Sequence, residues 1–240
     1  MTDTSNPRPL ADKIALVTGA SRGIGAATAR ALGAAGAHVI LTARTAKGLE
    51  EVEEAIFAEG GNATIAPLDL TENESIARLA AAIEGRWPAL DIMVLNAATL
   101  GSLSAVPAID SKDFAKLLTL NVSAQAALLT AFDPMLRKAG AARIIGLTSS
   151  VARTPRAYWG MYGASKAAFE NLLLSYGEEV RHLSGTRVAI LDPGATRTAM
   201  RARAFPGEDP LSIKPPEVVA DRIVALAASN FEPGHFERVE

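Results

Sequence analysis

The sequence predicts a single α/β domain built on a doubly wound parallel sheet, with helices on both faces. Apolar, strand-like runs alternate with segments of helical period along all 240 residues, without an internal repeat, a linker or a second domain. These runs are continuously apolar, which is typical of strands that helices cover on both sides.

The first half of the chain repeats one strand–helix unit. The run 14–18 ends in a glycine-rich turn and leads into a helix from about 23 to 35. The run 39–42 precedes a helix that carries Leu49, Val52 and Ile56 on one face. The run 63–67, the helix 72–84 and the strand 91–95 follow in the same order.

The second half continues the alternation with longer helices. A helical stretch covers 111 to about 136, and strand 143–147 precedes a helix from about 158 to 183. Strand 187–191, helix 216–228 and a short last strand near 235–239 complete the pattern. We divide the chain into a flexible segment, 1–10, and one dinucleotide-binding domain, 11–240. Residues 197–216 are rich in proline, glycine and charge, and we expect them to form a substrate lid.

Composition excludes several classes of function. The chain has no cysteine, which rules out disulfides, thiolate catalysis and cysteine-bound metals, and its three histidines are too scattered to bind a metal. A net charge of −2 gives no basic surplus for nucleic acid. The start of the chain has no secretory h-region, and polar residues and breakers interrupt the uncharged run 92–109. We therefore expect a cytoplasmic protein without a membrane span.

A glycine-rich turn joins the first strand to the first helix. It runs from Thr18 to Gly25 with the spacing G-x-x-x-G-x-G, and glycines there let the backbone approach a pyrophosphate at the helix N-terminus. The residues expected to bind the cofactor in this turn are Gly19, Ser21, Arg22, Gly23, Ile24 and Gly25. Asp69, followed by Leu70, closes the third strand. Its carboxylate could accept from an adenine amino group or cap the following helix, and the two interpretations are compatible.

Tyr162 and Lys166 lie four residues apart on a predicted helix and hence on one face. A nearby ammonium favours the phenolate and lowers the pKa of a tyrosine, which suits it to proton transfer. Ser149 follows the preceding strand, where open α/β sheets bind ligands, and its hydroxyl can donate to a substrate oxygen. Asn121, in the long helix before that strand, is a candidate to hold a water in a proton relay.

With these motifs in order and at the right spacing, the chain resembles the short-chain dehydrogenase/reductase family over nearly its whole length. This resemblance implies a Rossmann-type fold and the catalytic tetrad Asn121, Ser149, Tyr162 and Lys166. It makes Tyr162 the acid/base, while Lys166 binds the nicotinamide ribose. It also implies cofactor contacts from the P-G motif and the residues after it, namely Pro193, Gly194, Thr196 and Thr198.

Two features depart from the family pattern or leave it ambiguous. The motif N-N-A-G reads Leu95-Asn96-Ala97-Ala98, so Asn96 and Ala97 are kept as expected cofactor contacts with altered packing. Ser149 and Ser150 are adjacent. The thirteen-residue spacing to Tyr162 favours Ser149, and strand alternation would let only one of the two face the site.

NADP(H) is the expected cofactor. A site specific for NAD places a carboxylate at the end of the second strand, but this strand ends Leu41-Thr42-Ala43-Arg44. Arg44 and Arg22 can each grip a 2′-phosphate with paired hydrogen bonds. The expected reaction moves a hydride between nicotinamide and a carbonyl or secondary alcohol on a small molecule. Neither the substrate nor the physiological direction can be read from the sequence.

Two other functions are compatible with parts of the sequence. Gly19 to Gly23 also spells G-x-S-x-G, which would make Ser21 the nucleophile of an esterase with Asp192 and His235. An elbow on the first strand leaves no earlier strand for an oxyanion loop, so this alternative is remote. The fold could also bind a dinucleotide without catalysis, as a regulatory module.

Apolar residues surround more of two helices than one sheet contact needs. They are Ala164, Ala167, Ala168, Leu172, Leu173 and Leu174 on one helix, and Val122, Ala126, Leu128 and Leu129 on the other. The family resemblance also implies pairing through these two helices. We therefore expect a homodimer or homotetramer.

Overall fold

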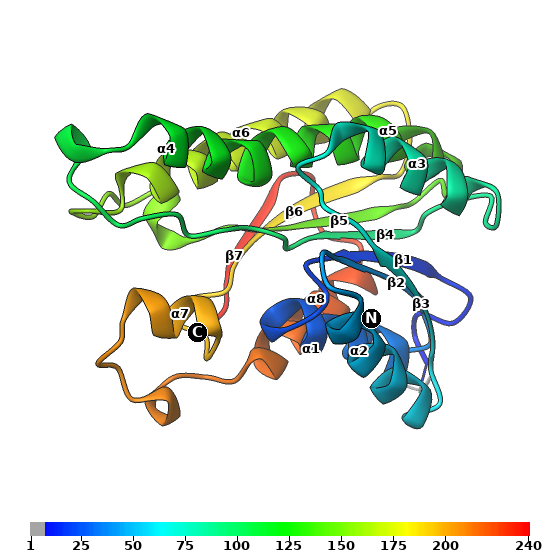
Figure 1. The fold of residues 1–240 in the computed structure, drawn as a ribbon. Helices are drawn as coiled ribbons and strands as arrows, with labels where there is room; N and C mark the ends of the chain where they lie inside the picture. The colour runs from blue at the N-terminus through cyan, green and yellow to red at the C-terminus, as the bar shows by residue number, and fades with distance from the viewer. Residues whose placement is uncertain (1–7) are drawn as a thin grey trace.

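A computed structural model describes residues 8–240 of the protein (Figure 1). Seven strands form one sheet in the order β3-β2-β1-β4-β5-β6-β7, and all six neighbouring pairs are parallel. The strands are β1 (Ile14–Thr18), β2 (His38–Ala43), β3 (Asn62–Pro67), β4 (Ile92–Leu95), β5 (Arg143–Leu147), β6 (Arg187–Asp192) and β7 (His235–Arg238). The predicted doubly wound α/β fold is confirmed.

Helices cover both faces of the sheet, and each layer buries its own core (Figure 1). On one face lie α1 (Gly23–Ala34), α2 (Ala46–Ala58) and α8 (Pro216–Ala227). On the other lie α3 (Asn73–Glu84), α4 (Ser111–Leu118), α5 (Ala124–Lys138) and α6 (Gly160–Val180). Strand order reverses between β1 and β4, so the carboxyl ends of these strands border the crevice where such sheets bind ligands.

The long helix predicted over 111–136 is interrupted. A π-helical turn, Thr119–Ser123, separates α4 from α5. Among the described residues, the run Ser111–Lys138 alone is long and apolar enough to span a membrane by length and composition. Its Leu128, Phe132 and Leu136 are buried in the core against the sheet, and this packing accounts for the apolar face.

Three predicted boundaries are corrected. The segment 1–10 was expected to be flexible throughout. Residues 1–7 lie outside the described part, but Leu10 is buried and its N–H donates to the Ala35 carbonyl at 2.9 Å, so packing begins before residue 11. Helix α6 starts two residues later than predicted because Tyr158 has a φ of +71°, outside the helical region. Residues 197–216, expected to be irregular, contain the short helix α7 (Ala199–Ala204) and a 3₁₀ turn, Pro210–Ser212.

Candidate active site

The glycine turn between β1 and α1 has the geometry of a backbone cradle. Gly19 and Gly23 have φ values of +66° and +56°, which glycine adopts without strain. A Cβ on Gly25 would lie 2.2 Å from the Gly19 carbonyl oxygen, so no larger residue fits there. Arg22 occupies the N-cap of α1 but its side chain caps no N–H. The first N–H groups of the helix can therefore meet an anion.

Asn96 fixes this turn from the neighbouring strand. Its amide nitrogen donates to the carbonyls of Thr18 and Gly19 at 2.9 and 3.3 Å. The buried Thr18 hydroxyl accepts from the N–H groups of Asn96 and Ala97, both at 3.0 Å, and donates to the Val94 carbonyl. The altered L-N-A-A motif thus keeps the hydrogen bonds that tie β4 to the glycine turn.

The charged residues predicted to bind the adenosine end of the cofactor are Arg22 in the turn, Arg44 after β2 and Asp69 after β3. Arg22 and Arg44 are exposed, and neither forms an ion pair with any residue that the structure describes. The Asp69 carboxylate accepts from the Thr71 N–H and hydroxyl at 2.9 and 2.8 Å. These bonds, with a smaller effect of the Arg44 charge, lower the pKa of Asp69. Asp69 does not cap α3, because that helix begins at Asn73 after Glu72. Leu70 is buried.

Tyr162 and Lys166 lie buried on the first turns of α6. The Lys166 ammonium donates to the Leu147 carbonyl at 2.7 Å and lies 5.9 Å from the centre of the Tyr162 ring. Burial, aided by the negative charge of Asp192, raises the pKa of Tyr162. Burial also lowers the pKa of Lys166 to about 8, while the charge of Glu170 opposes this. In the protein alone the pKa of Tyr162 is therefore raised and not lowered as predicted, because burial disfavours the phenolate.

Ser149 and Ser150 lie beyond β5, which ends at Leu147. Ser149 is extended (φ −160°, ψ 150°), whereas Ser150 opens a 3₁₀ turn and its carbonyl accepts from Arg153 and Thr154. The strand alternation used to separate the two serines therefore does not apply to them. Ser149 remains the predicted site residue on its spacing to Tyr162.

Asn121 sits in the π-helical turn and is almost fully buried. Its side-chain oxygen accepts from the Thr99 N–H at 2.8 Å, and its nitrogen donates to the Thr99 carbonyl and the Ser165 hydroxyl at 2.9 and 3.0 Å. Ser165 lies on α6 between Tyr162 and Lys166, so Asn121 braces the helix that carries these two predicted site residues. Both hydrogens of the Asn121 side-chain amide are used in these bonds. A water in the predicted relay would therefore have to bond the remaining lone pair of the Asn121 side-chain oxygen or a donor from another group.

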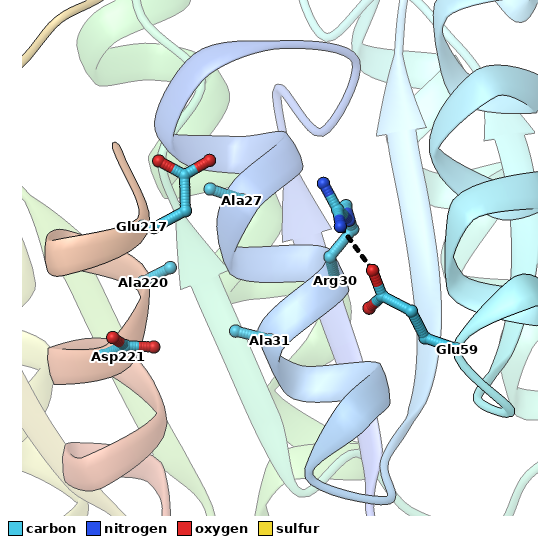
Figure 2. Close-up of a pocket in the computed structure, with 7 residues that line it drawn as sticks. All are labelled: Ala27, Arg30, Ala31, Glu59, Glu217, Ala220 and Asp221. Atoms are coloured by element: carbon cyan, nitrogen blue, oxygen red, sulfur yellow. Dashed lines mark hydrogen bonds and ion pairs between the residues drawn. The ribbon is translucent and has the colours of Figure 1, made fainter. Parts of the chain in front are cut away.

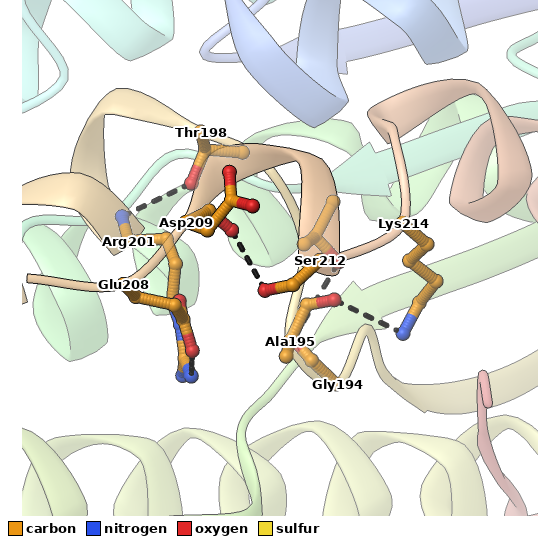
Figure 3. A network of polar contacts seen from close by, with 9 residues as sticks. Gly194, Ala195, Thr198, Arg201, Glu208, Asp209, Ser212 and Lys214 are labelled. Carbon is orange, nitrogen blue, oxygen red and sulfur yellow. Dashed lines mark hydrogen bonds and ion pairs between the residues drawn. The ribbon is translucent and has the colours of Figure 1, made fainter. Parts of the chain in front are cut away.

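The segment after β6 returns to the glycine turn. Gly194 has a φ of +61° and its N–H donates to the Asp192 carboxylate at 3.0 Å, while the Thr196 hydroxyl donates to the Pro193 carbonyl at 2.8 Å. Thr198 caps α7, as Figure 3 shows, by accepting from the Arg201 N–H. The methyl group of Thr198 lies 3.4 Å from where a Cβ on Gly23 would be. The fold therefore brings the segment after Pro193-Gly194 against the glycine turn.

Apolar side chains enclose Tyr162. Leu100 and Val151 are buried against it, with Met200 and Ala204 of α7 packed beside them. The Trp159 ring meets Tyr162 edge-on at 6.0 Å and stacks on Phe205 at 5.6 Å. None of these neighbours could be predicted, because nothing in the local sequence indicates which distant side chains will meet a tyrosine.

A charged pair links α7 to the residues that follow it. The Arg201 guanidinium makes two hydrogen bonds to Glu208, at 2.6 and 2.5 Å (Figure 3). The same guanidinium lies 3.7 Å from the centre of the Phe205 ring. Arg203 donates to the Gly101 carbonyl at 2.9 Å. The Arg201–Glu208 pair therefore lies within the segment 197–216, whereas the Arg203–Gly101 bond ties α7 to the loop after β4.

A groove lies elsewhere in the described residues, away from the predicted site. Figure 2 shows a groove between α1 and α8, floored by alanines and bordered by the Arg30–Glu59 pair and by Glu217 and Asp221. None of the predicted site residues lines it. No group of His, Asp and Glu in residues 8–240 could hold a metal ion.

The esterase constellation is not assembled. Asp192 binds the Gly194 N–H, whereas His235 contacts Glu237 and pairs in register with Ala189, three residues before Asp192 on β6. Ser21 lies in the cofactor turn, before α1. The alternative with Ser21 as a nucleophile therefore gains no support from the fold.

Comparison with known proteins places this geometry in a family. A family model described as short chain dehydrogenase matches residues 13–209. The oxidoreductase YciK of Escherichia coli K12 is 38% identical over 210 residues, which are 86% of this chain and 82% of that protein.

Among solved structures, a short chain dehydrogenase from Shigella flexneri 2a complexed with NADP is 35% identical, with a TM-score of 0.93 over 98% of this chain and 99% of that one. A metagenomic short-chain oxidoreductase in complex with NADP is 33% identical, with a TM-score of 0.82 over 96% and 97% of the two chains. With a family model over most of its length and relatives of this similarity, the chain belongs to the short chain dehydrogenase family of oxidoreductases.

Proposed function

We propose that the protein is an NADP(H)-dependent oxidoreductase that interconverts a carbonyl and a secondary alcohol, with Tyr162 as its general acid/base. One observation carries this proposal above the others. Tyr162 and Lys166 are buried four residues apart on α6, and Lys166 is bonded to the carboxyl end of β5, where Ser149 follows. This edge of the sheet is where open α/β folds bind ligands.

The residues present fit NADP(H). The positive φ values of Gly19 and Gly23, and the contact that excludes a Cβ at Gly25, suit a pyrophosphate beside the N-terminus of α1. Arg22 and Arg44 suit the 2′-phosphate, and the relatives crystallised with NADP or NADPH support the same cofactor. Asn96, Ala97 and the segment from Pro193 to Thr198 would complete the site, with Asp69 and Leu70 beside the adenine. When bound, the cofactor supplies or accepts the hydride.

The protein's own residues would handle the proton and the substrate oxygen. In the reductive direction, the Tyr162 phenol donates its proton to the carbonyl oxygen while the Ser149 hydroxyl donates a hydrogen bond to it. The Tyr162 hydroxyl makes no hydrogen bond within residues 8–240, so it can bond a substrate oxygen. The Lys166 ammonium would favour the phenolate that forms and would bind the nicotinamide ribose.

The walls around Tyr162 favour an uncharged substrate with an apolar group near the carbonyl. Leu100, Val151, Trp159 and Phe205 offer apolar surface, and Arg201 of the adjoining α7 is already paired with Glu208. We also propose that residues 197–216 act as the lid, that the protein acts as a homo-oligomer in the cytoplasm, and that neither nucleic acid nor a membrane is a partner.

The test is turnover across a panel of carbonyls and alcohols, followed through NADPH and NADP absorbance, with aromatic ketones, acyl chains, sugars, polyols and steroids included. Reduction of at least one class, with NADPH preferred, is expected. Tight NADPH binding without turnover of any class would instead favour the non-catalytic dinucleotide-binding module.

A further inference from the structure

Glu170 is a buried carboxylate in α6 to which the proposed mechanism gives no role. Tyr162, Lys166 and Glu170 follow one another at intervals of four residues, so they share one face of the helix. Only 7%, 4% and 7% of their respective surfaces are exposed. Glutamate is rarely buried to this extent unless its charge is matched by partners, so these partners indicate what it does.

Both partners of the carboxylate come from the turn after β5. The Thr148 hydroxyl donates to Oε1 at 2.5 Å, and Arg153 Nε donates to Oε2 at 2.8 Å. The Arg153 guanidinium lies 3.5 Å from the centre of the Phe236 ring on β7. Glu170 therefore fastens both ends of the turn 148–153 to the catalytic helix.

Thr148 occupies a central place in this turn. It lies between Leu147, whose carbonyl accepts the hydrogen bond from Lys166, and Ser149, the proposed donor to the substrate oxygen. Its own N–H donates to the Leu191 carbonyl on β6 at 2.9 Å. Because misplacement of reacting groups by about 1 Å can cost roughly 100-fold in rate, a bond that fixes Thr148 bears on both neighbours.

The charge of Glu170 also acts on Lys166. Burial lowers the pKa of this lysine to about 8, and Glu170 is the charged group that opposes the shift. Two other charged groups lie near this helix. The Asp192 carboxylate raises the pKa of Tyr162, and the Arg153 guanidinium forms an ion pair with Glu170. Glu170 is thus the anion, among the described residues, that favours the ammonium form of Lys166.

We propose that Glu170 is a positioning residue that holds the Thr148 turn in place and maintains Lys166 as an ammonium at neutral pH. This inference rests on the proposed function, because it assigns Glu170 to the residues that would perform the reaction. It implies two separable effects, a geometric one through the Thr148 hydroxyl and an electrostatic one through space.

The experiment compares Glu170→Gln with Thr148→Val, which keeps the charge of Glu170. Glu178→Gln is the matched control, because Glu178 is an exposed carboxylate on the same helix. The Lys166 Nζ is titrated by ¹⁵N NMR in the protein without cofactor, with Lys166→Arg as the assignment control. The second readout is kcat/KM for NADPH over the same pH range.

Glu170→Gln should lower the pKa of Lys166 and move the alkaline fall of kcat/KM to lower pH, with a loss of about 10- to 100-fold at pH 8. Thr148→Val should lower kcat/KM about tenfold and leave the Lys166 titration unchanged. Glu178→Gln should change neither.

An unchanged Lys166 titration in Glu170→Gln would overturn the electrostatic role, even if activity fell at every pH. Wild-type kcat/KM in Thr148→Val would overturn the positioning role. Thermal unfolding checks that the variants fold. If Glu170→Gln does not fold, kcat/KM of Thr148→Val decides whether Glu170 positions the turn. Absence of turnover by the wild type would refute the proposed function instead, and the NMR titration would still report on Glu170.

Discussion

Burial sets the protonation states of the two residues that the proposed mechanism uses. It raises the pKa of Tyr162 and lowers that of Lys166, because both charged forms lose hydration inside the protein. Near pH 7 the phenol therefore keeps its proton, and the lysine, below its pKa of about 8, is mostly an ammonium. Tyr162 can donate in carbonyl reduction, while oxidation requires that the phenolate be stabilised.

Replacing Tyr162 by phenylalanine removes the transferable proton and keeps the ring. The hydroxyl bonds no described residue, so the substitution leaves no partner unsatisfied and the fold should be retained. We expect kcat to fall by about 10²- to 10⁴-fold, the usual scale for general acid–base catalysis. Titration with NADPH should show unchanged cofactor binding. Near wild-type turnover by this variant would exclude Tyr162 as the acid/base.

The pH dependence of NADPH capture should report Lys166. The ammonium is present below a pKa of about 8 and is lost as the pH rises through that value, so kcat/KM for NADPH should fall on the alkaline side. An unburied lysine would retain its charge for about two further pH units, since its pKa is near 10.4. A flat profile between pH 7 and 10 would contradict this assignment.

We expect residues at the end of β2 and the start of α1 to determine the preference for NADP(H) over NAD(H). Arg22 and Arg44 are exposed and unpaired there within the described chain, and a charge-assisted bond to the 2′-phosphate contributes about 1.5–3 kcal/mol. The wild type should therefore prefer NADP(H) by roughly ten- to a hundredfold per arginine. The measurement is kcat/KM for both cofactors.

The double variant Ala43→Asp, Arg44→Ala should lose or invert this preference, because its carboxylate repels the 2′-phosphate and accepts from a 2′-hydroxyl. Arg30→Ala is the matched control, since Arg30 lies on α1 but pairs with Glu59. The ratio of the two kcat/KM values should be unchanged in the control. A wild type that prefers NAD(H) would show that neither arginine has the proposed role.

The lid is the element whose mobility should respond to ligands. Residues 197–216 contribute none of the fully buried side chains of the core. The Arg201–Glu208 pair braces the segment internally, and the Trp159–Phe205 stack attaches it to the rest of the protein. Hydrogen exchange in this segment should slow when cofactor and substrate bind together. Glu208→Gln should speed exchange in α7 of the free protein, whereas the exposed Glu217→Gln should not. Equal exchange in the free and ternary states would argue against a lid.

Elements defined by local pattern could be predicted from the sequence. All seven strands end within one residue of their predicted ends, because an apolar or strand-forming run is recognisable from the local sequence. The π-helical turn at Thr119–Ser123 could not, because it coincides with bonds from Asn121 to Thr99 and Ser165, which are distant in sequence. Nor could α7, whose packing depends on the remote Trp159.

The same limit applies to the site. The glycine turn and the Tyr162–Lys166 pair follow from spacing along a turn and a helix, and in the structure they lie before α1 and on α6. The reversal of the tyrosine pKa shift follows from burial, which spacing does not reveal. The role of Glu170 could not be predicted from the sequence, because its partners, Thr148 and Arg153, are 22 and 17 residues away.

For the whole molecule, the surface left by the fold suggests that the chain assembles with copies of itself. The faces of α5 and α6 that point away from the sheet border a groove of about 650 Å³. Small and apolar residues line much of it, including Ala126, Leu129, Ala168 and Leu172. Ala164 and Ala167 on α6 are exposed beside them. Such a face is stabilised when a second copy covers it, and closed two-fold symmetry is the commonest arrangement.

Light scattering at micromolar concentration should therefore give at least twice the protomer mass of 25.0 kDa. Leu172→Asp places a charge on the half-buried face of α6 and should shift the protein toward monomer, because an unpaired charge is costly in an apolar interface. Leu183→Asp is the matched control. Leu183 is an exposed leucine just beyond α6 and outside the groove, so its replacement should leave the mass unchanged. A monomeric wild type would refute self-association, and equal effects of the two substitutions would show that the interface lies elsewhere.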